Sequence, residues 1–159
     1  MQSTARDSYL VAEVMTAPPQ KLHLMLIEAA IRFAEKARKH WAAQENDLAL
    51  ESLIRAQEIV GEMLAGLNRE VDAQLVGRVA SVYLFVFRRL MEAASSRDEA
   101  KLADALRILE INRQTWREVC GRLSGAGESF SPSRAAVAAP LPAEPTPGDA
   151  PGAAFSMDA

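Results

Sequence analysis

The sequence is poor in the residues that many structural and catalytic sites require. It has one cysteine, Cys120, which excludes an internal disulfide and a cysteine-based zinc site. No stretch reaches the ~18 uninterrupted apolar residues that a membrane span needs, so we expect no membrane insertion. The first residues, Met1 to Asp7, are polar and lead into no apolar run, which argues against a secretory leader. These absences favour a protein of the reducing cytosol.

An excess of basic charge is also missing. The chain carries 18 Lys and Arg against 21 Asp and Glu. One of those basic residues, Arg134, and four of the acidic ones lie beyond Leu123, so the residues up to Leu123 are electrically balanced. Binding to nucleic acid relies on neutralising phosphates with Lys and Arg. Nucleic acid is therefore not expected as a partner.

Catalytic and cofactor motifs are absent as well. The Glu-x-x-His pairs of a di-iron bundle are missing, because neither His23 nor His40 follows a glutamate by three residues. No glycine-rich phosphate loop occurs, since the central glycines are isolated within helical patterns: Gly61, Gly66 and Gly77. Cys120 lies at a bundle-facing helical position, where we expect a small buried hydrophobic residue. We therefore expect no enzyme activity, no cofactor or nucleotide and no metal.

What the sequence does contain is a large apolar fraction, 49%, arranged at helical spacing. A first row repeats at i, i+3 and i+4 and is predicted to face the core: Leu22, Met25, Leu26, Ala29, Phe33 and Ala37. A second row lies on an adjoining face of the same predicted helix: Leu24, Ile27 and Ile31. A small helical protein that is apolar on more than one side either buries the second side elsewhere or offers it to a partner. We therefore predict that surplus rows of this kind form a binding surface.

Helix start and stop signals predict four helices after an N-terminal arm. The arm, residues 1–17, has a short amphipathic pattern, and Pro18 and Pro19 then open a helix that is expected to reach about residue 41. Asn46 and Asp47 are the expected cap of a second helix, which ends near residue 67. A third helix is expected over about 74–94. The sequence from Ser96 to Glu99 has the S-x-x-E pattern of a capping box, which predicts a fourth helix reaching about residue 123.

Short connections between long helices make neighbouring helices antiparallel. The expected fold is therefore an all-α, antiparallel up-down-up-down four-helix bundle over residues 18–123. Residues 124–159 are rich in proline, glycine and alanine and have few large apolar side chains, so we expect a disordered tail. Near its end, Phe155 and Met157 are more simply interpreted as part of an unconstrained terminus than as a docking motif.

Two other functions are compatible with a helical bundle. Histidine phosphotransfer domains are four-helix bundles with one exposed reactive histidine, and this chain has His23 and His40. Neither histidine has small, glycine-containing neighbours, so a structural role with a satisfied imidazole is favoured at both positions. A generic helical adaptor with a different client is the second alternative.

Four segments, in order along the chain, carry a resemblance to one protein family. Tyr9, followed by Thr16, Ala17 and Pro19, looks like that family's tyrosine arm and its T-A-x-P helix start. Residues 21–30 are similar to its K-L-I-x-M-L-Y-D-G-A pattern, and residues 53–60 follow L-I-K-A-Q-x-I-I. Tyr83 and residues 88–93 look like L-Y-x-Y-M-x-R-R-L-x-E-A-N, and a tryptophan follows in the last helix. The chain resembles the flagellin-specific export chaperones, the FliS family, over roughly residues 9–120.

Some positions depart from the family pattern. Isoleucine and alanine at positions 27 and 29 replace the usual tyrosine and glycine, and the aromatic run before Arg88 is altered. Pro18 occupies the position where a capping Ser or Asp is common, so Thr16 is expected to cap the following helix instead.

The resemblance implies capture of the disordered C-terminal segment of flagellin in the cytosol, which prevents premature polymerisation. Delivery to the flagellar type III export apparatus is implied as well, with export components as further partners. Apolar grooves between helices suit this role because they accept the i, i+3, i+4 and i+7 anchors of a partner helix. The arm is expected to act as a flap over part of the groove. The candidate flagellin-binding residues come from the arm and the surplus rows: Tyr9, Val14, Leu24, Ile27, Ile31, Ala56, Ile59, Met63, Tyr83, Phe87 and Met91.

Overall fold

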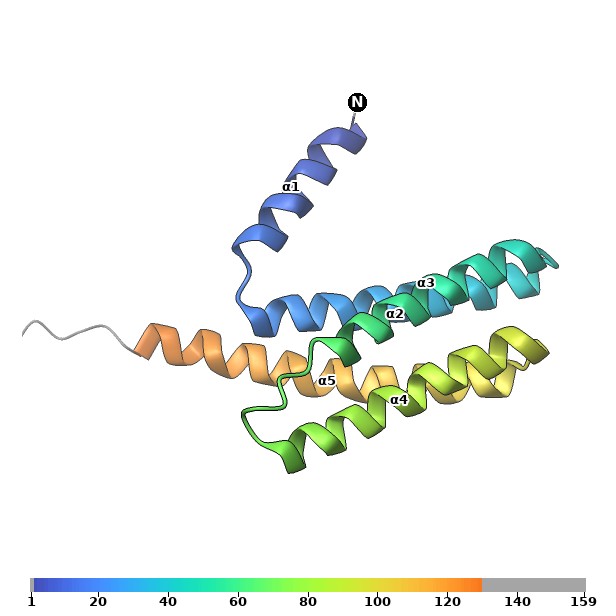
Figure 1. The fold of residues 1–159 in the computed structure, drawn as a ribbon. Helices are drawn as coiled ribbons and strands as arrows, with labels where there is room; N and C mark the ends of the chain where they lie inside the picture. Colours follow the sequence, from blue (N-terminus) through green and yellow to red (C-terminus); the bar gives the residue numbers. More distant parts are fainter. Residues whose placement is uncertain (1, 130–159) are drawn as a thin grey trace, which may run out of the picture. The chain divides into compact units, whose positions relative to one another are not determined.

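The computed structural model describes residues 2–129, and within that range the chain consists of helices and the connections between them (Figure 1). Its five helices are α1 (Gln2–Thr16), α2 (Pro19–Ala42), α3 (Asn46–Ala65), α4 (Ala73–Ser96) and α5 (Glu99–Ser129). The described residues include no strand, so the predicted all-α class is confirmed. Within the same range, no helix has the length and apolar character that crossing a membrane would require.

Helices α2 to α5 pack in a closed cycle. Helix α2 contacts α3 and α5, and α4 contacts the same two helices (Figure 1). Each of the four helices therefore has two neighbours on which to bury one apolar stripe. Helix α1 makes few contacts with the other helices and is the element that the sequence did not predict.

The junction between α1 and α2 shows why the N-terminal arm is a separate helix. Pro18 and Pro19 lack backbone N–H groups, so α1 cannot continue through them, and Pro19 opens α2 as predicted. The Thr16 hydroxyl donates to the carbonyls of Ala12 and Glu13, at 2.8 and 3.4 Å. Thr16 therefore bonds back into α1, and the expectation that it caps α2 is wrong.

The start of α3 differs from the prediction. Glu45 is the residue before the helix, and no side chain caps it, so the expected capping by Asn46 and Asp47 is wrong. The Glu45 carboxylate instead lies 2.5 Å from Nδ1 of His40, across a turn in which Gln44 has a φ of 65°. Both residues expected to cap lie inside the first turn, where their side chains cannot reach the free N–H groups ahead of them.

The start of α5 is capped by a different residue from the one predicted. The hydroxyl of Ser96 donates to the carbonyl of Glu92 within α4, so the expected capping box at Ser96 is wrong. Asp98 accepts bonds from the N–H groups of Ala100 and Lys101 instead, at 2.9 and 3.2 Å. An aspartate both satisfies these donors and places a negative charge at the positive end of the helix.

Helix α5 extends to Ser129, beyond the predicted end near residue 123. It therefore includes the first residues of the expected disordered tail. The rest of that tail, residues 130–159 with Phe155 and Met157, lies outside the described residues.

The core is formed by one buried face from each of α2, α3, α4 and α5, and each face mixes alanines with larger apolar side chains. Helix α2 contributes Ile27, Ala30, Ile31, Ala34, Ala37 and Trp41 to the buried cluster. The first row predicted to face the core is instead half-buried or exposed, apart from Ala37. The two rows of α2 were thus assigned to the wrong faces. An alanine-rich face allows neighbouring helices to approach closely, so it is buried although its residues are small.

Candidate functional site

The candidate binding residues predicted from the sequence fall into three groups by exposure. Five are buried in the core, which contradicts their assignment to an open surface in this conformation: Ile27, Ile31, Ala56, Met63 and Tyr83. They point inward because they lie on the stripes by which α2, α3 and α4 contact one another. Leu24, Ile59 and Phe87 are half-buried. Tyr9, Val14 and Met91 are exposed, with exposed fractions of 69%, 45% and 48%.

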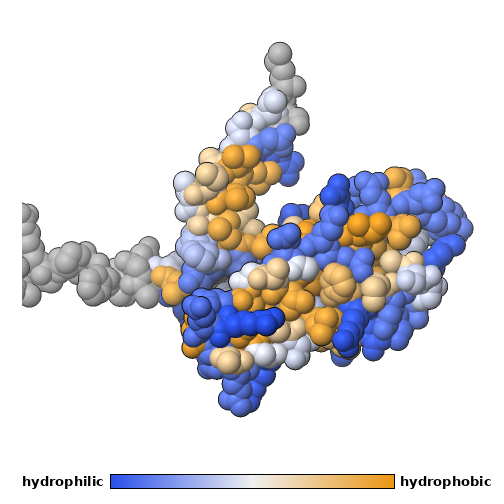
Figure 2. Space-filling view, in the orientation of Figure 1, coloured by the Kyte–Doolittle hydropathy of each residue, from blue (hydrophilic) through white to orange (hydrophobic). Residues whose placement is uncertain are grey.

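An apolar groove of about 650 Å³ lies where α1 and α2 approach each other. We call it the α1–α2 groove. Its apolar lining comes from two positions of α1 and five of α2: Leu10, Val14, Leu22, Leu24, Met25, Leu26 and Ala29. Figure 2 shows hydrophobic side chains gathered along α1 and on the neighbouring part of α2. Two of these residues, Val14 and Leu24, were among the predicted candidates, whereas Leu22, Met25 and Leu26 had been assigned to the core.

Charged residues line the edge of the α1–α2 groove, and we call them its charged rim. They form one ion pair between α1 and α2 and another between α2 and α5. Lys21 pairs with Glu13 across the junction, with 2.8 Å between Nζ and the carboxylate. Arg117 of α5 reaches Glu28 on the opposite side at 2.8 Å. The hydrogen bond from Glu13 raises the pKa of Lys21 above its ordinary value. Because Lys21 and Arg117 are exposed to solvent, such pairs contribute little to stability. Their position makes them suited to orienting a bound segment.

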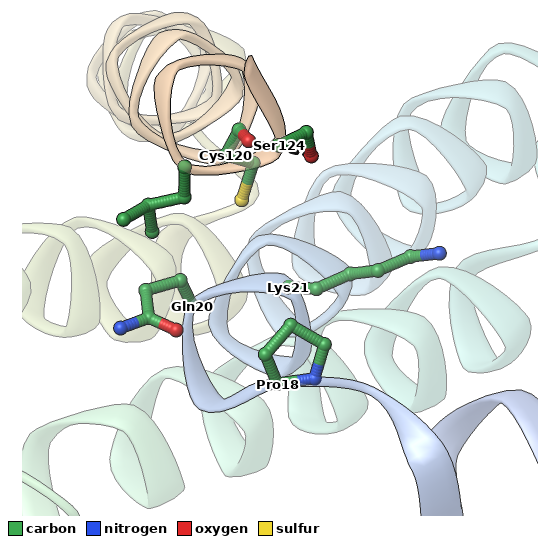
Figure 3. A pocket seen from close by; sticks show the side chains of 6 residues that line it. Pro18, Gln20, Lys21, Cys120 and Ser124 are labelled. Atoms are coloured by element: carbon green, nitrogen blue, oxygen red, sulfur yellow. Dashed lines mark hydrogen bonds between the residues drawn. The ribbon is translucent and has the colours of Figure 1, made fainter. Parts of the chain in front are cut away.

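A second, smaller pocket of about 330 Å³ adjoins the groove and shares Lys21 with it. It lies between the start of α2 and the end of α5, where Pro18 and Gln20 face Cys120 and Ser124 (Figure 3). The sulfur of Cys120 points toward the first turn of α2 (Figure 3). Cys120 is half-buried and lies outside the buried core cluster, so its assignment as a buried core residue is wrong.

The outer faces of α3 and α4 carry further exposed apolar residues. On α3, Leu50 and Ile54 line a shallow hollow with the acidic residues Asp47 and Glu51. On α4, exposed apolar side chains recur near its middle: Val82, Leu84 and Phe85. These residues were not predicted as candidates because they lie beside the apolar row that was assigned to the core of each helix. The number of apolar residues per helical turn, which exceeds what one row needs, could have indicated them.

Both histidines are engaged with other side chains, in agreement with the predicted structural roles. Nε2 of His23 lies 2.5 Å from the hydroxyl of Tyr83, and the rings of His23 and Trp116 have centroids 4.4 Å apart. His40 contacts Glu45 through Nδ1. Over the described residues, no group of three or more His, Cys, Asp and Glu side chains is arranged to hold a metal ion. Neither histidine is presented as the free imidazole that phosphotransfer requires.

Comparison with known proteins identifies a family by sequence. The sequence model of the flagellar protein FliS family matches residues 1–123, which include α1 to α4 and most of α5. The flagellar secretion chaperone FliS of Bacillus subtilis (strain 168) is 29% identical over 111 residues, which cover 70% of this chain and 82% of the relative. The FliS of Salmonella typhimurium (strain LT2) is 25% identical over 112 residues, covering 70% and 83%.

The fold has a counterpart among solved structures. A crystal structure of a bacterial flagellar chaperone superposes with a TM-score of 0.56 at 17% identity, and the match covers 77% of this chain and 99% of the other. At this identity the likeness supports the fold alone. The family match over most of the chain is the stronger finding, and from it we conclude that the chain belongs to the FliS family of flagellar secretion chaperones.

Proposed function

We propose that this chain binds the disordered C-terminal segment of flagellin in the cytosol. Binding keeps flagellin from polymerising prematurely and delivers it to the flagellar type III export apparatus, whose components are the further partners. The family supports the general role, since its curated members are named flagellar secretion chaperones. No catalytic step is needed for this task, and a chaperone is not an enzyme class.

The α1–α2 groove is the observation that carries the proposal. It presents seven apolar side chains along two helices, and three of them, Leu10, Val14 and Leu26, are exposed. An amphipathic segment whose apolar residues recur at i, i+3, i+4 and i+7 matches such a lining. The charged rim, with Lys21, Glu28 and Arg32, contains both signs of charge and can pair with polar residues that flank the anchors.

The expected energetics fit a chaperone that must release its cargo. Folding a disordered segment onto a surface buries roughly 1,000–3,000 Å² and costs about 2–5 kcal/mol in ordering. The remaining free energy corresponds to dissociation constants from about micromolar to nanomolar. Affinity of this order holds the client and still allows transfer to an export component.

Architecture and domain limits belong to the same proposal. We propose that α2 to α5 form an antiparallel up-down-up-down four-helix bundle, the chaperone domain of residues 18–123. Residues 1–17 are the arm, and residues 124–159 are the tail. Among the sequence-predicted candidates, the accessible ones are the proposed client contacts: Tyr9, Val14, Leu24, Ile59, Phe87 and Met91.

A direct test mixes the purified full chain with a peptide that spans the C-terminal segment of flagellin. Calorimetry measures the heat of binding, and circular dichroism of the mixture against its separate components measures the gain in helix. We expect saturable binding at micromolar concentrations or below, with a gain in helicity. A peptide of the same composition in scrambled order, which has lost the helical spacing of its apolar residues, should not bind. Equal binding of the two peptides, or none of either, would contradict the proposal.

A further inference from the structure

Side chains from three helices meet at His23. His23 comes from α2, Tyr83 from α4 and Trp116 from α5. The hydroxyl of Tyr83 lies 2.5 Å from Nε2 of His23. The ring of His23 contacts both aromatic rings, with centroid separations of 5.7 Å to Tyr83 and 4.4 Å to Trp116. We call this set the His23–Tyr83–Trp116 cluster.

Burial of Tyr83 determines the direction of this hydrogen bond. Tyr83 is 0% exposed, and Nε2 of His23 is the hydrogen-bond partner of its hydroxyl. The hydroxyl hydrogen is therefore satisfied when it is donated to Nε2. An imidazole nitrogen accepts only when it carries no proton, so this arrangement requires neutral His23 protonated at Nδ1.

Protonation of His23 reverses this bond. The new Nε2–H would donate to the oxygen of Tyr83, and the hydroxyl hydrogen of Tyr83 would lose its acceptor. Because Tyr83 is 0% exposed, water cannot replace that acceptor, and a buried polar group without a partner destabilises the folded chain.

Among the residues that the structure describes, no carboxylate pairs with His23 to offset that cost. Beside it on α2, Lys21 pairs with Glu13 of α1, and Glu28 pairs with Arg117 of α5. Helix α4 carries no charged residue between Arg78 and Arg88.

The charged residues of α5 and α3 near this cluster are paired or exposed. On α5, Arg113 pairs with Glu110, and Glu118 is exposed. The charged residues of α3 are all exposed: Asp47, Glu51, Arg55, Glu58 and Glu62. Burial lowers the pKa of His23 and raises that of Tyr83 to about 12, so both groups are held neutral.

We propose that His23 is a pH-sensitive latch that joins α2 to α4 and α5 while it is neutral and loosens α2 when it is protonated. Leu22 and Leu24, the neighbours of His23 in sequence, both line the α1–α2 groove. Loosening α2 therefore disturbs the groove itself, and acidification weakens capture of the client. The effect on the client rests on the proposed function, whereas the effect on stability does not.

The sign of the pH dependence follows from the lowered pKa of His23. The unfolded chain, with an ordinary histidine pKa near 6.5, binds the proton before the folded chain does. The stability that His23 contributes is therefore fully present above about pH 6.5 and is lost progressively as the pH falls toward the lower, folded-state pKa.

The test compares the full chain with two variants in thermal melts between pH 8 and pH 5. His23→Gln is the informative variant, because the glutamine side chain can accept a bond from Tyr83 but does not titrate. His40→Gln is the matched control, since it removes the other histidine. We expect the wild type and His40→Gln to lose more melting temperature on acidification than His23→Gln, by roughly 2–4 °C. Identical pH profiles for the wild type and His23→Gln would overturn the latch.

A nuclear magnetic resonance titration of the wild-type imidazoles tests the latch without any substitution, and it decides the matter if His23→Gln does not fold. We expect His23 to titrate below pH 6.5, with its Nδ1 protonated above that pH. Titration at or above pH 6.5 would refute the latch. Measuring the affinity for flagellin peptide across the same pH range separates the two proposals. If the peptide does not bind at any pH, the proposed function is refuted. The latch is still tested by the thermal melts and the titration.

Discussion

Replacing Tyr83 with phenylalanine tests how the interior of the bundle is held together. The ring of Tyr83 is 0% exposed and belongs to the core cluster of α4, and phenylalanine would fill the same space. Only the hydroxyl would be lost. Nε2 of His23 would then have no donor.

The magnitude follows from the unpaired imidazole nitrogen of His23. A buried donor or acceptor left without a partner costs about 1–3 kcal/mol. His23 is half-buried, so water can partly satisfy this nitrogen and the lower part of that range applies. We expect Tyr83→Phe to lower the free energy of unfolding by about 1–2 kcal/mol at pH 7.5.

The assay is equilibrium unfolding in urea, monitored by circular dichroism, with the slope of the transition compared between variants to confirm that both unfold in the same way. The double variant His23→Leu with Tyr83→Phe is the matched control. Replacing both partners with apolar groups removes the unpaired imidazole, so it should recover part of the loss and show a coupling of about 0.5 kcal/mol or more. A loss of unfolding free energy below about 0.5 kcal/mol for Tyr83→Phe would show that the Tyr83 hydroxyl makes no stabilising hydrogen bond. Additive effects of His23→Leu and Tyr83→Phe would show the same.

Three other substitutions test the local structure and the arm. Gly77→Ala should stabilise the chain by about 0.5–1 kcal/mol in urea unfolding, because Gly77 lies inside α4 and no atom lies within 4 Å of an added Cβ; destabilisation would indicate that α4 does not extend over this position. Asp98→Ala should cost about 0.5–2 kcal/mol through loss of the α5 cap, and Ser96→Ala should cost much less, whereas the reverse order would restore the capping box at Ser96. Tyr9→Ala should change the affinity for flagellin peptide while leaving the melting temperature nearly unchanged, because Tyr9 is 69% exposed; a large loss of stability would place Tyr9 in the core.

The overall fold could be predicted because the signals that determine it are local. The prolines at 18 and 19 and the helical spacing of apolar residues predicted the helices from α2 to α5 to within a few residues, apart from the late end of α5. The predicted caps failed where several polar residues compete near one helix start. Ser96 and Asp98 are both acceptable caps by type, and the structure favours the aspartate, which lies next to the first residue of α5.

The faces of α2 could not be predicted from side-chain size. Side-chain size alone predicts Leu22, Met25 and Leu26 as the core row, because burying large apolar groups releases more free energy. The structure instead buries Ala30, Ala34 and Ala37 together with two isoleucines and Trp41. Close helix approach is a property of the whole packing arrangement, and one helix considered alone does not reveal it. The amount of apolar surplus was therefore predicted correctly, while its position on α2 was not.

The most direct test of the account is whether flagellin peptide binds at the α1–α2 groove. Two variants of equal chemistry separate the groove from general surface effects: Leu26→Asp within it, and Ile111→Asp on an exposed position of α5 outside it. Leu26 is 37% exposed and Ile111 is 57% exposed, so both should fold. Calorimetric titration with the flagellin C-terminal peptide should give an affinity at least tenfold weaker for Leu26→Asp and unchanged for Ile111→Asp. Equal affinities for the two variants would contradict the assignment of the groove as the client site.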